Sequence, residues 1–215
     1  MSLRTEMLAL LDDPGINFTM PANGSFPAAT VNAALFRRVR TAVEGYTVPI
    51  IVDPTLLANM APCDVRTGEP TVRPFDAVYQ TGAIPSVGNR FVFSGNSLAG
   101  VHQRALAIHE SVHAGFDLNS VTIWAVDDEA ASYLAQCVYL LRNSVTAAVP
   151  PTPIFTAAFA AASSIVASTS TSTSTSASAS PAPTAIQLAA LRTAIQNEPL
   201  YQNIQAPGSR RIRNG

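Results

Sequence analysis

Two helical patterns joined by a short connection constrain the fold of this chain more than any other feature. Apolar residues recur at helical spacing from about Leu98 to Phe116, and again from about Ala125 to Arg142. A connection of about ten residues is too short to cross the molecule, so the second helix must return antiparallel and pack on the first. We therefore expect the domain to be built around this helix pair.

The shorter patterns before this pair mix helix and strand. Residues 28–44 have the spacing of an amphipathic helix with its arginines toward solvent. The β-branched run at 48–52 and the alternating run at 89–94 each predict a strand. Residues 61–88 are rich in Gly, Pro and Asp, which indicates short strands or loops without a firm register. Together these patterns predict the α+β class.

Composition limits the classes of binding partner that are expected for the chain. Its 215 residues, 47% of them hydrophobic, can form one good core. A net charge of -1 gives no electrostatic reason to expect nucleic acid, because only the tail at 209–213 is locally basic. The apolar stretch Ile154–Ala167 is shorter than the roughly 20 residues that span a bilayer, so no membrane partner is expected either.

Residues near the N-terminus and the two cysteines bear on location. Met1–Asp13 carries charges around a short Leu-rich run and lacks the pattern of a signal peptide, which predicts a cytoplasmic protein and leaves delivery to another cell open. Cys63 and Cys137 match neither a disulfide framework nor a metal-binding spacing. Both are predicted to be reduced thiols, and Cys137 falls in an apolar helical pattern that suits burial.

A change of composition divides the chain. We predict a catalytic domain at 1–147, an Ala, Pro, Ser and Thr-rich linker at 148–183, and a C-terminal helix with a basic tail at 184–215. The linker includes Ser168–Ser180, which has too little apolar surface to fold alone. The first domain is therefore expected to fold without the rest, while the C-terminal helix, 184–197, could dock on it or contact a partner.

The chemistry concentrates in the first helix of the pair, in the run His109-Glu110-Ser111-Val112-His113. Residues four apart lie on one helix face, so His109 and His113 can bind one Zn²⁺ ion. Zinc in such a site takes a third protein ligand and leaves one position for water. Glu110 stands beside that water and is the predicted general base.

The second helix offers three candidates for the third ligand, Asp127, Asp128 and Glu129. Glu129 is predicted to bind the metal because its arm is longer and its neighbours are small alanines, which let the two helices approach closely. Asp127 and Asp128 are more ordinarily capping residues at a helix start. A first-turn acid that complements the helix dipole is the other interpretation of Glu129.

Two further residues near the motif are weighed as site residues. His102 lies seven positions before His109, about 10.5 Å along a continuous helix, so it cannot share the ion and is expected to be partly exposed. Tyr133 shares the face of Glu129 and could donate a hydrogen bond to a ligand or an oxyanion, although core packing is its more ordinary role.

From Phe91 through Leu141 the chain resembles the catalytic core of gluzincin-type metallopeptidases, and it is most similar to the small ImmA/IrrE-like proteases. The residues that carry the resemblance are the strand at 89–94, the motif His109–His113 and the run Asp128–Ala135. The resemblance covers about residues 28 to 142 and implies a minimal gluzincin-like domain, in which a short mixed sheet packs on the motif helix and a following glutamate-bearing helix. It also implies that the last strand of the sheet receives an extended peptide beside the zinc. The DNA-binding helix-turn-helix of those proteins is not found in the N-terminal sequence.

The function expected from these features is zinc-dependent hydrolysis of a peptide bond in a protein or peptide substrate, which would be a regulatory protein or the target of a delivered toxin. The alternative is a non-catalytic structural or interaction protein of a larger assembly, contacted through residues 148–215, in which the motif survives only as scaffold. Metal content distinguishes these two interpretations.

Overall fold

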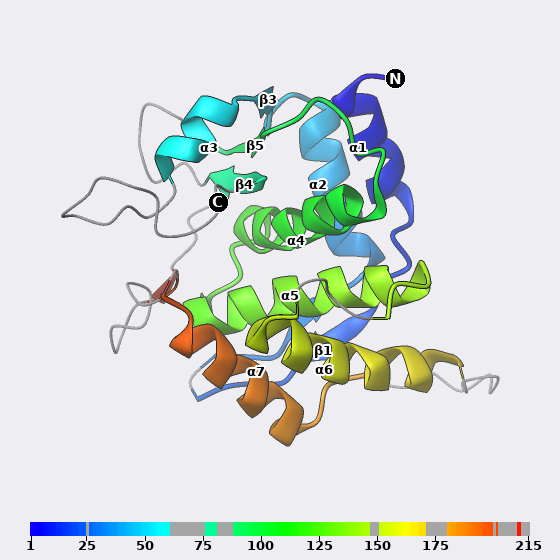
Figure 1. The fold of residues 1–215 in the computed structure, drawn as a ribbon, viewed down its shortest axis with the longest axis vertical. Helices are drawn as coiled ribbons and strands as arrows, with labels where there is room; N and C mark the ends of the chain where they lie inside the picture. Colours follow the sequence, from blue (N-terminus) through cyan, green and yellow to red (C-terminus); the bar gives the residue numbers. More distant parts are fainter. Residues whose placement is uncertain are drawn as a thin grey trace.

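The computed structural model describes residues 1–24, 26–60, 76–80, 88–146, 151–170, 180–199, 201 and 210–211. These residues form a mixed α+β fold in which helices predominate, as Figure 1 shows. The predicted α+β class is confirmed.

The N-terminal part forms two helices with a strand pair between them: α1 (Leu3–Asp12), β1 (Phe18–Met20), β2 (Ala29–Val31) and α2 (Ala33–Glu44). β1 and β2 pair antiparallel, with Phe18 opposite Val31. The side chain of Asn32 then accepts hydrogen bonds from the backbone N–H groups of Ala34 and Leu35 and so begins α2. The prediction that this helix starts at residue 28 is wrong, because residues 29–31 are strand.

A small mixed sheet follows, built from β3 (Ile50–Val52), β4 (Ala77–Gln80) and β5 (Arg90–Phe93), with α3 (Pro54–Met60) after its first strand. The order is β3-β5-β4, with β3 parallel and β4 antiparallel to β5. β5 is therefore the central strand. Because β5 pairs on both sides, a strand edge that could receive a peptide would belong to β3 or β4, and the expected peptide contact stays a prediction. Residues 61–75 and 81–87 of the predicted irregular region lie outside the described residues.

The predicted helix pair is present as α4 (Val101–Leu118) and α5 (Ala125–Arg142), joined through β6 (Ile123–Trp124). The pair is antiparallel, because His109 contacts Gln136 while His113, further along α4, contacts Asp128. In Figure 1, α4 lies between α5 on one side and α2 with the sheet on the other. Every residue from 107 to 117 is consequently buried.

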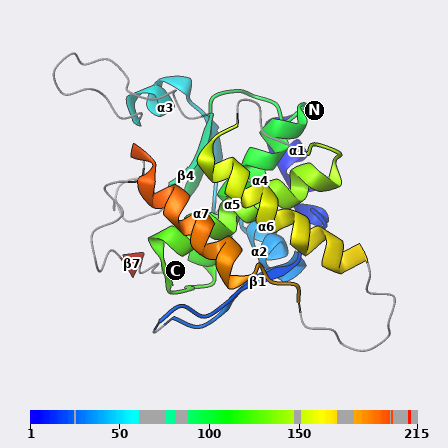
Figure 2. The same ribbon diagram turned by 60° about the horizontal axis from the view of Figure 1, so that its bottom comes forward.

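Two C-terminal helices, α6 (Pro153–Ser170) and α7 (Ala185–Asn197), cover the remaining face of α5 (Figures 1 and 2). Within the predicted linker, residues 153–170 form helix α6 instead, because Ile154, Phe159 and Ile165 are buried against α5. The Ser and Thr-rich residues 171–179 lie outside the described part of the chain.

The C-terminal helix is confirmed and docks on the molecule itself. The side chain of Thr184 accepts from the backbone N–H of Gln187, whose side chain bonds back to the Thr184 backbone, forming a capping box that starts α7. A two-residue strand, β7 (Arg210–Arg211), pairs antiparallel with β6. No helix within the described ranges combines the length and apolar character needed to cross a lipid bilayer.

Candidate metal centre

Buried polar side chains gather in the helix pair. Among the described residues, every buried polar or charged side chain belongs to α4 or α5: His109, Glu110, Ser111, His113, Asp117, Asp127, Asp128, Glu129, Ser132 and Gln136. Burying a carboxylate is costly unless it is paired or binds a cation. The desolvation of so many polar groups is unfavourable and is not needed to pack two helices. Their concentration therefore indicates a functional site at the α4–α5 interface.

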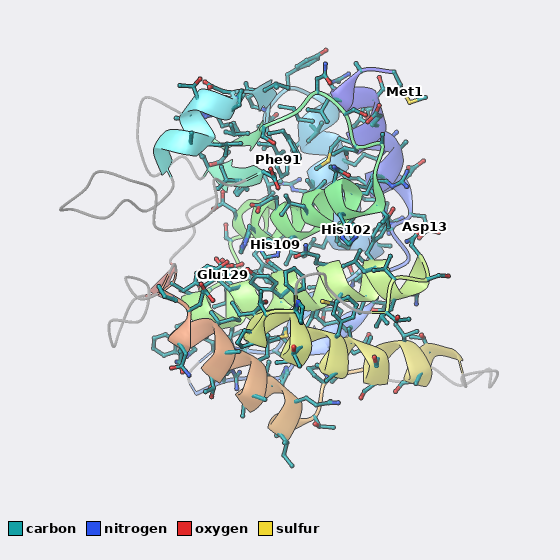
Figure 3. All side chains as sticks on the ribbon, in the orientation of Figure 1. Met1, Asp13, Phe91, His102, His109 and Glu129 are labelled. Carbon is teal, nitrogen blue, oxygen red and sulfur yellow. The ribbon has the colours of Figure 1, made fainter. Side chains whose placement is uncertain are left out.

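The two histidines of the motif and Glu129 converge on one point. Nε2 of His109 and Nε2 of His113 lie 3.3 Å apart, and Oε2 of Glu129 lies 3.6 Å from each of them. All three side chains are buried. In Figure 3, His109 on α4 and Glu129 on α5 lie near each other, while His102 lies further along α4. The predicted trio is thus brought together.

Outer hydrogen bonds turn both imidazoles toward this point. Nδ1 of His113 lies 2.8 Å from the Asp128 carboxylate, and Nδ1 of His109 lies 3.1 Å from the side-chain oxygen of Gln136. Both partners are acceptors, so each Nδ1 donates to them, and Nε2 is the ring nitrogen that each histidine turns toward the other histidine and Glu129. A carboxylate behind a ligating histidine is a common arrangement in metal sites.

The spacing of the three atoms fits a tetrahedral ion. Bonds of about 2.1 Å in a tetrahedral site put two ligand atoms about 3.4 Å apart, and the observed separations are 3.3, 3.6 and 3.6 Å. Two imidazoles with one carboxylate form a donor set typical of catalytic zinc, which keeps a fourth position open.

The electrostatics of the centre favour positive charge. Burial opposes protonation of His113, yet the carboxylates of Asp128 and Glu129 raise its pKa to about 10. Burial alone would raise the pKa of Glu129, but His113 and His109 hold it well below its usual value. The same fields that attract a proton attract a divalent cation.

Glu110 lies beside the trio and is held by the sheet. Its Oε2 accepts a hydrogen bond of 2.7 Å from the backbone N–H of Tyr79 in β4. The Tyr79 hydroxyl donates to Asp117, 2.8 Å away. Tyr79 is therefore bonded to α4 twice, through its backbone N–H and through its side chain. Burial raises the pKa of Glu110, although His109 and His113 oppose the shift. A raised pKa suits a general base that works near neutral pH.

Two tyrosines from different parts of the chain meet next to the trio. The ring of Tyr133 packs edge-on against His109, with centroids 4.6 Å apart, and its hydroxyl lies 2.9 Å from that of Tyr201. Tyr201 follows α7 in sequence. Burial and the Glu129 carboxylate raise the pKa of both phenols, which keeps them protonated. Tyr133 is therefore a neighbour of the centre rather than a core residue alone.

The remaining predictions have mixed outcomes. His102 is exposed, as predicted. Asp127 and Asp128 do not cap α5, whose start has no side-chain cap. Asp127 instead bonds Arg192 of α7 and Asn23, at 2.5 and 2.7 Å.

Sequence reasoning missed several partners in the centre. Gln136 could have been found, since it lies seven residues after Glu129 and so on the same helix face. Asp128 was predicted to be a cap, although its position beside Glu129 offered a carboxylate for the second histidine. Tyr79 and Tyr201 are placed by tertiary structure, and no local pattern signals them. Cys137 is buried, as predicted, and burial raises the pKa of its thiol.

No protein-family model matches this chain, and no curated protein or solved structure matches it either. The arrangement of side chains is therefore what bears on function.

Proposed function

We propose that this chain is a zinc-dependent peptidase, with His109, His113 and Glu129 as the metal ligands and Glu110 as the general base. The observation that carries the proposal is the convergence of two Nε2 atoms and one carboxylate oxygen within 3.3 to 3.6 Å of one another, with Glu110 one residue along the same helix. The resemblance to gluzincin-type metallopeptidases supports the same assignment.

A zinc ion held by these ligands would polarise the scissile carbonyl group and make water a better nucleophile. Glu110 would accept a proton from the attacking water and pass it to the leaving amine, a role that its pKa, raised by burial, favours. The Tyr79 N–H fixes one of its carboxylate oxygens and leaves the other for the water. Asp128 and Gln136 keep both imidazoles in the tautomer that binds metal.

The substrate class that we propose is a protein or peptide, and the cytoplasmic location expected from the N-terminal sequence stays a prediction. A library of peptides with randomised sequences, incubated with the zinc-loaded protein and analysed by mass spectrometry, tests the activity whichever sequence is cleaved. We expect cleavage at amide bonds with incorporation of one oxygen from labelled water, since hydrolysis places water oxygen in the new carboxylate.

Glu110→Gln is the decisive variant. It keeps the size of the side chain but removes the proton acceptor, so zinc content should match the wild type while the cleavage rate falls by about 10²–10⁴-fold. Glu44→Gln, an exposed exchange of the same kind in α2, is the matched control and should change neither quantity. A Glu110→Gln protein that cleaves peptides at the wild-type rate would contradict the role of Glu110 as general base.

One observation favours a second candidate, a structural metal centre in a non-catalytic interaction protein. His109, Glu110, His113 and Glu129 have exposed fractions of only 5 to 6%, and structural zinc sites are closed to solvent. This candidate predicts stoichiometric zinc and a lower melting temperature after chelation, with no peptide cleaved by the zinc-loaded protein. Those three results together would replace the peptidase assignment.

A further inference from the structure

The described residues that follow α7 reach the candidate metal centre at Tyr201. Leu188, Leu191 and Ile195 of α7 are buried in the same apolar core as α5. Arg192 pairs with the buried carboxylate of Asp127, two residues before Glu129. The chain after α7 is thus anchored next to the start of α5, and it places Tyr201 against Tyr133.

The paired hydroxyl groups of Tyr133 and Tyr201 have one O–H donor that their mutual hydrogen bond does not use. Two phenols have two O–H donors, and the contact of 2.9 Å between Tyr133 and Tyr201 uses one of them. Within the described part of the chain, neither hydroxyl has another hydrogen-bond partner. Both phenols are partly buried, and a ligand that brings an acceptor to the second O–H would gain a hydrogen bond there.

The position of Tyr133 indicates which acceptor that is. Tyr133 lies one helical turn after Glu129, and its ring contacts the ring of His109. Its hydroxyl is held on one side by Tyr201, and Phe155 of α6 packs on its ring with centroids 5.5 Å apart. A peptide bound at the centre would present its carbonyl oxygen beside the histidines, where a phenol donor can reach it.

We propose that Tyr201 is a positioning residue that holds the Tyr133 hydroxyl in place, so that Tyr133 donates a hydrogen bond to the carbonyl oxygen of a peptide bound at the centre. The proposal rests on the proposed peptidase function. Tyr201 donates to the oxygen of Tyr133, which polarises the Tyr133 O–H and makes it a stronger donor. The C-terminal segment, which the sequence left free to dock on the catalytic domain or on a partner, thereby becomes part of the active site.

The test is a double-mutant cycle with Tyr133→Phe and Tyr201→Phe in the zinc-loaded full-length protein. The readout is the affinity for a small hydroxamate, acetohydroxamate, whose carbonyl oxygen stands in for that of a peptide, measured by calorimetry. We expect Tyr133→Phe to weaken binding about tenfold, the loss of one hydrogen bond. Tyr201→Phe should weaken binding in the wild-type background and have no effect in the Tyr133→Phe background. Tyr139→Phe, a buried exchange on the same helix, is the matched control and should bind like the wild type.

Zinc content and melting temperature are measured for every variant, which separates this proposal from the proposed function. A wild type without zinc overturns the peptidase assignment and this proposal with it. If the wild type binds zinc, three outcomes overturn the positioning role alone: unchanged affinity in Tyr201→Phe, equal effects of Tyr201→Phe in both backgrounds, or loss of zinc or folding in Tyr201→Phe. Equal effects in both backgrounds would indicate a general structural role.

Discussion

Neighbouring acids at the start of α5 have different partners, and this division of roles is the main finding at the scale of single residues. Successive helix positions point in directions about 100° apart. Glu129 therefore faces the Nε2 atoms of both histidines, Asp128 reaches Nδ1 of His113, and Asp127 pairs with Arg192. The proposed metal ligand, its outer support and the anchor of α7 thus occupy consecutive positions.

Asp128→Asn tests the outer support. The amide keeps the size and one acceptor oxygen but removes the charge that favours an electron-rich imidazole, so zinc affinity should fall about 10–100-fold. Competition with a chromophoric chelator measures this change. Asp12→Asn, an exposed exchange in α1, should leave the affinity unchanged. If Asp128→Asn binds zinc within twofold of the wild type, the His113–Asp128 contact does not tune the centre.

Sequence alone predicts the residues of the centre that share a helical period. His109, Glu110 and His113 follow from spacing on one helix, and Glu129 follows from the short connection and the reach of its side chain. Tyr79 could not be predicted, because its backbone N–H reaches Glu110 only once β4 packs on α4. Tyr201 lies 68 residues from Tyr133, and no periodicity relates residues at such a separation.

At the scale of elements, the burial of α4 depends on the close packing of α2 against it. A Cβ atom built on Gly115 would lie 2.4 Å from two side-chain carbons of Leu35. Leu35 is itself buried, with an exposed fraction of 6%, so it has little room to move. Gly115, two residues after the second histidine, thus lets α2 support the helix that carries the motif.

Gly115→Ala tests this packing. The added methyl group overpacks the α2–α4 contact, and we expect the free energy of unfolding to fall by about 1–3 kcal/mol, partly offset by the better helix propensity of alanine. Urea denaturation followed by circular dichroism measures the change. Leu35→Ala combined with Gly115→Ala should be less destabilising than the sum of the single changes, since the smaller side chain relieves the clash. Additive effects would show that the two residues do not compete for space.

Periodicity predicted the long elements better than the short ones. α4, α5 and α7 appear close to their predicted ranges, because each carries a sustained apolar pattern. β2 was included in a helix, since three residues are too few to show alternation and pairing with β1 decides their conformation. β5 was predicted as a strand, but its central place depends on pairing with two other segments.

At the scale of the whole molecule, helices from the N-terminal and C-terminal parts of the chain share one apolar core. The buried residues of α6 and α7 belong to the same cluster as those of α1, α2, α4 and α5. The composition of residues 148–183 concealed this, because alanine, serine and threonine give a weak apolar pattern. The few large side chains there, such as Ile154, Phe159 and Ile165, are nevertheless enough to cover α5.

Removal of all residues after 147 tests this continuity, and the structure leads us to expect the opposite of the independent folding predicted from sequence. Each large apolar side chain lost from the core costs about 1.5–3 kcal/mol, so six of them (Ile154, Phe159, Ile165, Leu188, Leu191 and Ile195) approach the whole stability of a domain, about 5–15 kcal/mol. Thermal denaturation should show no cooperative transition in this truncation. Removal of residues 202–215 alone, the control, should preserve one. A cooperative transition near the wild-type melting temperature in the longer truncation would contradict a shared core.

The central claim is that His109, His113 and Glu129 hold one zinc ion, and metal content tests it most directly. The full-length protein is loaded with zinc, freed of unbound ion by gel filtration and analysed by inductively coupled plasma mass spectrometry. We predict about one zinc per chain for the wild type and for His102→Ala, and little or none for His113→Ala and Glu129→Ala that remain folded. A wild type without zinc, or a Glu129→Ala protein that retains the full content, would contradict the assignment.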